Sequence, residues 1–195
     1  MEHEEGRTFI SGKNVNLLPG NNLEHINLYA KWDNDQETRR YARNIFPHSP
    51  EEYKKWIEEV KTGTPSQINF EIWHRADAKI IGYVCFNHIQ WTDRGANIGM
   101  VIGEPEYRSK DLGTEAAALI IEYGFNELNL FKIGCGMFEV NVGSWKVAEK
   151  LGMQREIVYK EQAWVDGKYI DEYEYCIFHD EWKEKRKELL YLGSE

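Results

Sequence analysis

One loop of the sequence carries residues suited to holding a phosphate group. It covers residues 103–115, between a stretch typical of a β-strand and a stretch typical of a long helix. The first N–H groups of a helix lack partners within the helix and the helix dipole is positive there, so this position favours an anion. Arg108 and Lys110 add positive charge, and Gly113 allows the backbone to come close. Thr114 offers a hydroxyl, although a solvated connection between a strand and a helix would carry the same residue types.

This loop resembles the acyl-CoA diphosphate loop of the GNAT acetyltransferase superfamily, whose pattern is Arg/Gln-x-x-Gly-x-Gly/Ala. Arg108 and Gly113 match the pattern, and Asp111 stands at its first glycine. A carboxylate repels a diphosphate unless its side chain turns outward, and a residue with a Cβ resists positive φ, which Asp tolerates better than most. We therefore expect Asp111 to weaken the affinity for CoA.

Two later segments extend the resemblance towards the C-terminus. Residues 141–153 resemble the Asn-x-x-Ser-x-x-x-x-Glu-Lys-x-Gly-Phe segment of RimJ/RimL-type members, with Met153 in place of the aromatic residue. Residues 164–171, with Glu181-Trp182 beyond them, resemble the terminal hairpin and tail of that group. The chain is thus identified as similar to RimJ/RimL-like N-acetyltransferases of the GNAT superfamily.

The resemblance implies acetyl-CoA as the cosubstrate and no metal. In that fold the fourth and fifth strands splay apart, and the pantetheine arm lies between them, paired with the backbone near residues 100–102. A backbone N–H at or near Val101 would polarise the thioester carbonyl, and Asn141 would contact the pantetheine arm. The residues implied for acetyl-CoA binding are Met100, Val101, Ile102, Arg108, Ser109, Lys110, Asp111, Leu112, Gly113, Thr114, Asn141 and Ser144.

Acetyl transfer also needs a proton for the leaving thiolate. Many relatives place a tyrosine in the short helix after the conserved asparagine of the motif, and Ala148 occupies that position here. Ser144 is the polar residue that RimJ/RimL-type enzymes have in this helix, so it is the candidate for protonating or hydrogen-bonding the thiol sulfur. Alternatively, Ser144 caps the helix.

The amine needs a base that removes its proton, and relatives often carry a glutamate on the fourth strand. Asn97 stands at the comparable place and cannot accept a proton. The candidates are Glu71, on the second expected strand, and Glu139, near the end of the fifth. Glu139 alternates with Val140 along the strand, which would aim it at the cleft, although a solvated carboxylate at the strand end would look the same.

The acceptor is expected to be a small-molecule amine, such as an amino sugar or a polyamine, or a protein N-terminus. Residues 136–144 resemble relatives that acetylate nucleotide-linked amino sugars, which favours the small molecule, whereas the RimJ/RimL resemblance implies the protein N-terminus. Asp33, Asp35 and Glu37 would border the acceptor and attract a cation. A non-catalytic, regulatory acyl-CoA-binding domain is the alternative, suggested by Asp111, Asn97 and Ala148.

The elements that must position these residues follow from the hydrophobic patterns. Alternating and β-branched runs predict strands at 15–18, 68–73, 79–89, 96–102, 131–140, 157–165 and 169–178. Helical spacing predicts helices from 21, from 49, at 113–125 and at 144–151. The expected fold is α/β, a mixed, mostly antiparallel sheet of about seven strands, splayed between the fourth and fifth and flanked by helices. We expect a single domain over 1–195, with a flexible N-terminus at 1–12 and a helical tail at 180–195.

Composition narrows the classes of partner. The net charge of −9 disfavours nucleic acid, and no apolar run reaches membrane-spanning length. The acidic N-terminal sequence lacks the features of a signal peptide, so a cytoplasmic location is expected. The three cysteines form no CxxC pair, which indicates buried thiols rather than a disulfide or zinc. Edge strands near Ile157 and Tyr173 would need cover, which favours a homodimer.

Overall fold

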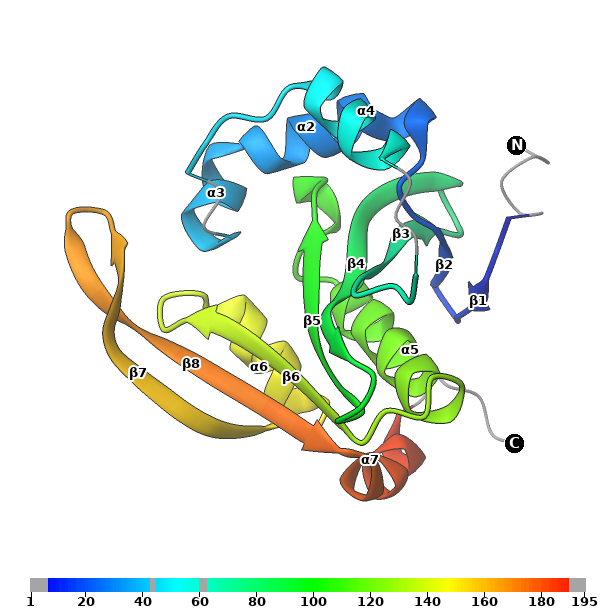
Figure 1. Ribbon diagram of the computed structural model, residues 1–195, viewed down its shortest axis with the longest axis vertical. Coiled ribbons are helices and arrows are strands. Elements are labelled where there is room, and N and C mark those ends of the chain that lie inside the picture. Colours follow the sequence, from blue (N-terminus) through cyan, green and yellow to red (C-terminus); the bar gives the residue numbers. More distant parts are fainter. Residues whose placement is uncertain (1–6, 43–44, 60–62, 190–195) are drawn as a thin grey trace.

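The computed structural model describes residues 7–42, 45–59 and 63–189. This part of the chain forms one sheet of eight strands, in the spatial order β1-β2-β3-β4-β5-β6-β8-β7 (Figure 1). The strands are β1 (Ile10–Ser11), β2 (Val15–Pro19), β3 (Ile68–His74), β4 (Lys79–Gln90), β5 (Gly95–Ile102), β6 (Lys132–Phe138), β7 (Gln154–Val165) and β8 (Lys168–Phe178). β5 and β6 run parallel and all other neighbours antiparallel. The expected α/β class with a mixed, mostly antiparallel sheet is confirmed, and the short β1 is the strand that the sequence analysis did not predict.

Helices lie between and after the strands. They are η1 (Leu23–His25), α2 (Ile26–Asn34), α3 (Gln36–Ala42), α4 (Pro50–Glu58), η2 (Pro105–Tyr107), α5 (Leu112–Asn126), α6 (Val142–Lys150), α7 (His179–Lys185) and η3 (Arg186–Glu188). None of the helices in the described ranges is long and apolar enough to cross a membrane. The outermost parts of the expected N-terminal arm and C-terminal tail, 1–6 and 190–195, lie outside the described residues.

Helices cover both faces of the sheet. Neighbouring residues of a strand point to opposite faces, so adjacent apolar residues need cover on both sides. On β2, Leu17 packs into the cluster that contains α5, whereas Leu18 packs with Tyr29 and Trp32 of α2. α5 therefore lies on one face, and α2 and α4 lie on the other. The connection from β2 to β3 contains α2 and α4, and the connection from β5 to β6 contains α5.

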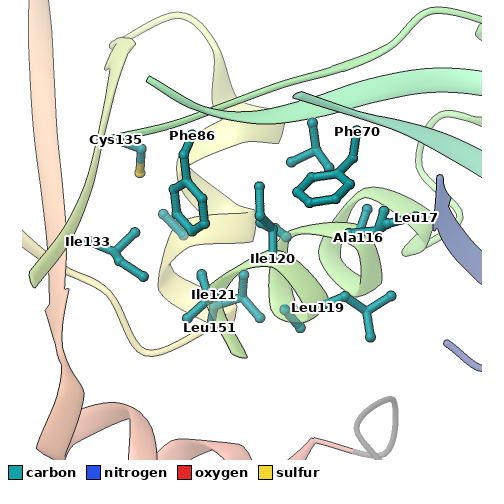
Figure 2. Packing of buried hydrophobic residues seen from close by; sticks show 14 of the residues in the cluster. Leu17, Phe70, Phe86, Ala116, Leu119, Ile120, Ile121, Ile133, Cys135 and Leu151 are labelled. Atoms are coloured by element: carbon teal, nitrogen blue, oxygen red, sulfur yellow. The ribbon is translucent and has the colours of Figure 1, made fainter. Parts of the chain in front are cut away.

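The main core lies between α5 and the sheet (Figure 2). The helix contributes Ala116, Leu119, Ile120 and Ile121, which pack against Leu17, Phe70, Phe86 and Ile133 of the strands, all of them nearly or fully buried. Burying one Leu, Ile or Phe side chain contributes about 1.5–3 kcal/mol, so this contact contributes strongly to stability. The core thus fixes the long helix against the centre of the sheet.

The first turn of α5 is held separately, through a buried carboxylate. Glu115 accepts hydrogen bonds from the backbone N–H groups of Asn14 (2.7 Å) and Val15 (3.1 Å). It also accepts a bond from the Asn14 side chain, so this carboxylate, which is only 1% exposed, is well hydrogen-bonded. These bonds fix the N-terminus of α5 relative to β2.

The sheet opens between β5 and β6, as expected for the fourth and fifth strands. The two strands pair only where residues 95–97 meet residues 132–134, and beyond these pairs they diverge (Figure 1). β5 continues to Ile102 along β4, and β6 continues to Phe138 along β8. The backbone of residues 98–102 therefore has no strand partner on the β6 side.

The hairpin of β7 and β8 differs from the expectation in one respect. β8 is paired on both sides, with β6 and β7, so Tyr173 lies on an interior strand and its expected place at an edge is wrong. Ile157 does lie on the edge strand, β7. β7 is the outer strand of the hairpin, and Asp166-Gly167 form its turn.

Candidate active site

A cleft of about 1400 Å³ opens where β5 and β6 diverge. Its walls come from these two strands and from β3 and β4, from the start of α5, from α6, and from α2, α3 and α4. Pockets for drug-sized ligands measure roughly 300–1,000 Å³, so this cleft has room for a large ligand and a second, smaller one. The sequence-derived site residues can be placed relative to it.

The loop before α5 adopts the conformation that an anion-binding turn requires. Ser109 and Asp111 both have positive φ, at 58° and 60°. Asp111 is the N-cap residue of α5, but its side chain makes no cap hydrogen bond. Instead its Oδ1 lies 2.7 Å from Nζ of Lys150 on α6. The side chain of Asp111 thus turns away from the helix end and leaves the first N–H groups of α5 uncapped.

Arg108 lines the cleft but is engaged by other protein groups. Its Nε donates to the carbonyl oxygen of Ile102 (2.9 Å), and its Nη1 binds the Glu37 carboxylate. Its Nη2 lies 3.4 Å from Oγ1 of Thr38 and 3.9 Å from Oδ1 of Asp35. Arg108 therefore joins the end of β5 to the start of α3.

The other residues of the expected phosphate loop divide into two groups. Ser109, Asp111, Gly113 and Thr114 line the cleft together with Met100, Val101 and Ile102 of β5. Lys110 and Leu112 are not among the lining residues: the Lys110 ammonium lies over the Tyr107 ring, 5.6 Å from its centre, and Leu112 is buried in the core. Gly113 lies close to β5, because a Cβ at this position would be 3.1 Å from Cε of Met100.

On the opposite wall, α6 begins at Val142, and its N-cap is Asn141 and not Ser144. The Oδ1 of Asn141 accepts a hydrogen bond from the backbone N–H of Ser144 (3.2 Å), which makes Asn141 the N-cap. The alternative interpretation of Ser144 as the cap is therefore wrong. Ser144 lies in the first turn of the helix, and both residues line the cleft, together with Ala148.

Of the two candidate bases, the structure brings Glu71 to the cleft. Glu71 is 1% exposed, lines the cleft, and accepts hydrogen bonds from the hydroxyl of Tyr29 and from Nδ1 of His25 (2.6 Å). Burial, followed by the nearby Glu71 charge, raises the pKa of Tyr29, so this phenol stays protonated and donates. Glu139 follows the end of β6 and is not among the residues that line the cleft.

A second buried carboxylate, Asp33, lies on the same wall. Its two oxygens accept hydrogen bonds from the hydroxyls of Tyr53 and Tyr83 (2.7 Å to Tyr83), and it is 9% exposed. Burial, followed by the Asp33 charge, raises the pKa of Tyr83. Glu37 also lines the cleft, whereas Asp35 is not among the lining residues. The N-terminal wall is therefore acidic.

Two of the three cysteines, Cys85 and Cys135, also line the cleft. All three are buried and unpaired, as the sequence analysis expected. Burial raises the pKa of Cys135 to about 12 and also raises that of Cys85. Both groups are therefore protonated at neutral pH and are poor nucleophiles. In the described residues no group of three His, Cys, Asp or Glu side chains could hold a metal ion.

Sequence reasoning missed several residues of the cleft. The phenols of Tyr29 and Tyr83 meet carboxylates that are 42 and 50 positions away in the sequence, so no local pattern could reveal them. Lys146 and Lys150 line the cleft from α6. Their spacing of four residues, which places them on one helix face, was visible in the sequence.

Known proteins share both sequence and fold with this chain. A family model described as an acetyltransferase (GNAT) domain matches residues 17–154, more than half of the chain. An uncharacterized N-acetyltransferase of Bacillus subtilis is 34% identical over 113 residues, which cover 58% of this chain and 65% of that protein. The spermidine N(1)-acetyltransferase of Escherichia coli is 31% identical over 110 residues, which cover 56% of this chain and 57% of that protein. Both alignments span less than two thirds of the relative's own length.

Solved structures show the same architecture. A spermidine N-acetyltransferase from Vibrio cholerae, in complex with CoA and spermine, has a TM-score of 0.76 at 20% identity and covers 87% of this chain and 98% of that one. A GNAT-family acetyltransferase from Bacillus anthracis has a TM-score of 0.73 at 23% identity and covers 88% and 98%. The splayed sheet, the uncapped helix at its opening and the family match over most of the chain agree: this protein belongs to the GNAT acetyltransferase family.

Proposed function

We propose that this protein is an N-acetyltransferase that moves the acetyl group of acetyl-CoA directly onto a primary amine bound in the same cleft. The observation that carries the proposal is the cleft itself, which runs from the splayed strands to the uncapped first turn of α5. One end offers unpaired N–H groups to an anion. The other end offers buried carboxylates to a cation.

Three features of the cleft fit acetyl-CoA. The first N–H groups of α5 suit its diphosphate, since Asp111 does not cap them. Residues 98–102 of β5 have a backbone edge without a β6 partner, which suits the amide groups of the pantetheine arm. Oδ1 of Asn141 is used by the helix cap, so Nδ2 is the atom that would reach the pantetheine.

In the proposed reaction the amine nitrogen attacks the thioester carbonyl. A C–N bond forms, the C–S bond breaks, the nitrogen loses a proton and the thiolate gains one. A backbone N–H of β5 at or near Val101, on the cleft wall, would stabilise the developing oxyanion. Direct transfer is favoured over an acyl-cysteine intermediate because the cysteines of the cleft are protonated.

We assign the base role to Glu71 and the proton donation to Ser144. Glu71 lies on the acidic wall, and Tyr29 and His25 fix its orientation. Ser144 lies on the α6 wall, where only its backbone N–H is needed for the helix cap, so its hydroxyl can serve the leaving sulfur. Glu139, which is not among the cleft-lining residues, has no part in this assignment.

A small-molecule amine is the favoured acceptor. Asp33, Glu37 and Glu71 line one wall of the cleft and would attract an ammonium group. A polyamine is one candidate, because spermidine N-acetyltransferases are among the similar proteins. An amino sugar is the other small-molecule candidate. A protein N-terminus, which the RimJ/RimL resemblance of residues 141–153 implies, is the second candidate class.

We further propose that the protein forms a homodimer through β7. This edge strand exposes Ile157, Val158 and Tyr159, with exposures of 37%, 42% and 41%. An unpaired edge with apolar side chains favours pairing with another strand. Light scattering at micromolar concentration should give the mass of a dimer, and Val158→Lys should shift it towards the monomer. A monomeric mass of the unaltered protein contradicts the proposal.

The function can be tested by following the release of free CoA thiol with a panel of amines. The panel contains spermidine, an amino sugar and a peptide with a free N-terminus, and calorimetry measures acetyl-CoA binding in parallel. We expect binding, and turnover with at least one small amine. Binding without turnover of any amine would support the regulatory, non-catalytic alternative. The absence of binding at millimolar acetyl-CoA would contradict the site itself.

A further inference from the structure

The positive charges expected at the phosphate loop are directed elsewhere. Arg108 is bound by Glu37 and by the carbonyl oxygen of Ile102. Lys110 is not among the cleft-lining residues, and its ammonium lies over the ring of Tyr107. Neither Arg108 nor Lys110, the two cations of the phosphate loop, is therefore directed at the uncapped end of α5.

Helix α6 supplies positive charge from the opposite wall. Lys146 and Lys150 both line the cleft, and their spacing places them on one face of the helix. Nζ of Lys150 lies 2.7 Å from Oδ1 of Asp111, the N-cap residue of α5. The ion pair therefore holds the ammonium of Lys150 at the phosphate loop.

This pair is suited to exchanging partners. The side chains of Lys150 and Asp111 are 46% and 63% exposed, and an ion pair this exposed contributes little to stability. A diphosphate at the end of α5 would present more negative charge than one carboxylate, so it competes well for the same ammonium. Without such an anion, Asp111 is the partner that lies against the ammonium of Lys150.

We propose that Lys150 binds the diphosphate of the coenzyme and that Asp111 is its positioning residue. The inference rests on the proposed function and adds to it a cation outside the phosphate loop. It also explains the aspartate at the first glycine of the loop pattern. Asp111 adopts the positive φ that the turn requires, at 60°, and Lys150 neutralises its charge.

The test compares Lys150→Met with Lys110→Met, a matched loss of one lysine at the same loop. Calorimetry measures binding of CoA, 3′-dephospho-CoA and pantetheine to each variant. We expect Lys150→Met to lose about tenfold in affinity for CoA and for 3′-dephospho-CoA, and to leave pantetheine binding unchanged, because a charge-assisted hydrogen bond to the diphosphate is lost. Lys110→Met should bind all three ligands like the unaltered protein.

Asp111→Asn gives a second readout, in a double-mutant cycle with Lys150→Met. With Lys150 present it should change CoA affinity little, because the loss of repulsion offsets the loss of positioning. In the Lys150→Met background, Asp111→Asn should raise CoA affinity several-fold, because it removes a carboxylate that Lys150 no longer neutralises. Equal effects in both backgrounds would contradict the proposed coupling.

Three outcomes overturn the inference and leave the proposed function standing. They are unchanged CoA affinity in Lys150→Met, an equal loss in Lys110→Met, or a loss that disappears with 3′-dephospho-CoA, which would assign Lys150 to the 3′-phosphate. If the unaltered protein itself binds no CoA, the proposed function fails first. Thermal unfolding of each variant confirms that the exposed substitution leaves the fold intact.

Discussion

Glu71 is the residue on which the proposed proton transfer depends. Its carboxylate is buried on the cleft wall, and the donors Tyr29 and His25 fix its orientation. As a carboxylate, this side chain can accept the proton that the amine loses.

Glu71→Gln should lower kcat by about 10²–10⁴-fold and leave acetyl-CoA affinity unchanged, because the amide keeps the shape but cannot take a proton. The deficit should shrink at higher pH, where more of the amine is neutral before it binds. Steady-state kinetics from pH 6 to pH 10 measure both effects. Glu139→Gln is the matched control and should keep full activity. The opposite ranking of the two variants would move the base role to Glu139.

Cys135 tests whether the transfer is direct. Its thiol lines the cleft, but burial raises its pKa to about 12, so almost no thiolate exists at neutral pH. Cys135→Ala should therefore keep kcat within a few-fold, and mass spectrometry should find no acetylated intermediate. A loss of several hundred-fold together with a trapped acetyl-enzyme would contradict direct transfer.

At the residue scale, the sequence predicted what depends on neighbours in the chain. The positive φ that Asp111 tolerates, the start of a helix soon after Asn141 and the burial of the cysteines follow from local patterns. The partner of Asp111 could not be predicted, because Lys150 is brought to it only by the packing of α6 beside α5. Which carboxylate lies in the cleft depends on the same long-range geometry.

At the element scale, the path of β5 decides where the cleft opens. Gly82 of β4 lies opposite Ile102 of β5, and a Cβ at Gly82 would be 2.0 Å from the carbonyl oxygen of Val101. The close approach of these two backbones requires a glycine. Gly82 thereby fixes the part of β5 that we assign to the thioester.

Gly82→Ala should lower the free energy of unfolding by about 1–3 kcal/mol, because the methyl group forces the two strands apart. It should also weaken acetyl-CoA binding, since residues 100–102 must shift. Urea unfolding and calorimetry measure the two effects. Gly95→Ala is the matched control on β5, where the added Cβ meets only the carbonyl oxygen of Lys132 at 3.9 Å. Equal stability of the two variants would contradict the close approach.

Most helices and strands could be predicted from the spacing of hydrophobic residues and from the residues that cap helices or form turns. The order of the strands in the sheet could not be predicted in this way. The possible cap Ser49 and the helical spacing after Gly113 placed α4 and α5 correctly. The strand runs at 157–165 and 169–178 gave a hairpin with the expected turn, yet they did not tell which strand pairs with β6. α6 begins two residues earlier than expected because Asn141 supplies the cap.

At the scale of the whole molecule, ion pairs connect the N-terminal helices to the rest of the cleft. Arg108 binds the start of α3, and Arg40 of α3 lies 2.6 Å from Asp166 in the turn of the β7–β8 hairpin. The two ends of α3 are therefore tied to the loop before α5 and to the β7–β8 hairpin. Such contacts depend on tertiary packing, and composition or local pattern could not have predicted them.

Glu104 forms the most buried of these connections. It is 6% exposed and accepts hydrogen bonds from Nζ of Lys31 (2.7 Å), Nε1 of Trp32 (2.8 Å) and Nζ of Lys79 (3.3 Å). Burial by itself would raise the pKa of this carboxyl, but the three donors outweigh burial and lower it to about 2. Glu104 thus fastens α2 to the segment between β5 and α5.

Glu104→Gln should reduce the free energy of unfolding at pH 7 by about 2 kcal/mol, because two ammonium groups lose a buried anionic partner. The folded pKa lies below the ordinary value of 4.5, so this stability is fully present above pH 4.5 and is lost as the pH falls towards 2. The difference between the variant and the unaltered protein should therefore be constant from pH 7 to pH 5 and shrink below that. Urea midpoints measured across this range test it, and Glu106→Gln, whose exposed carboxylate also binds Lys79, should cost much less. A difference that persists undiminished at pH 2 would mean that the charge of Glu104 does not stabilise the fold.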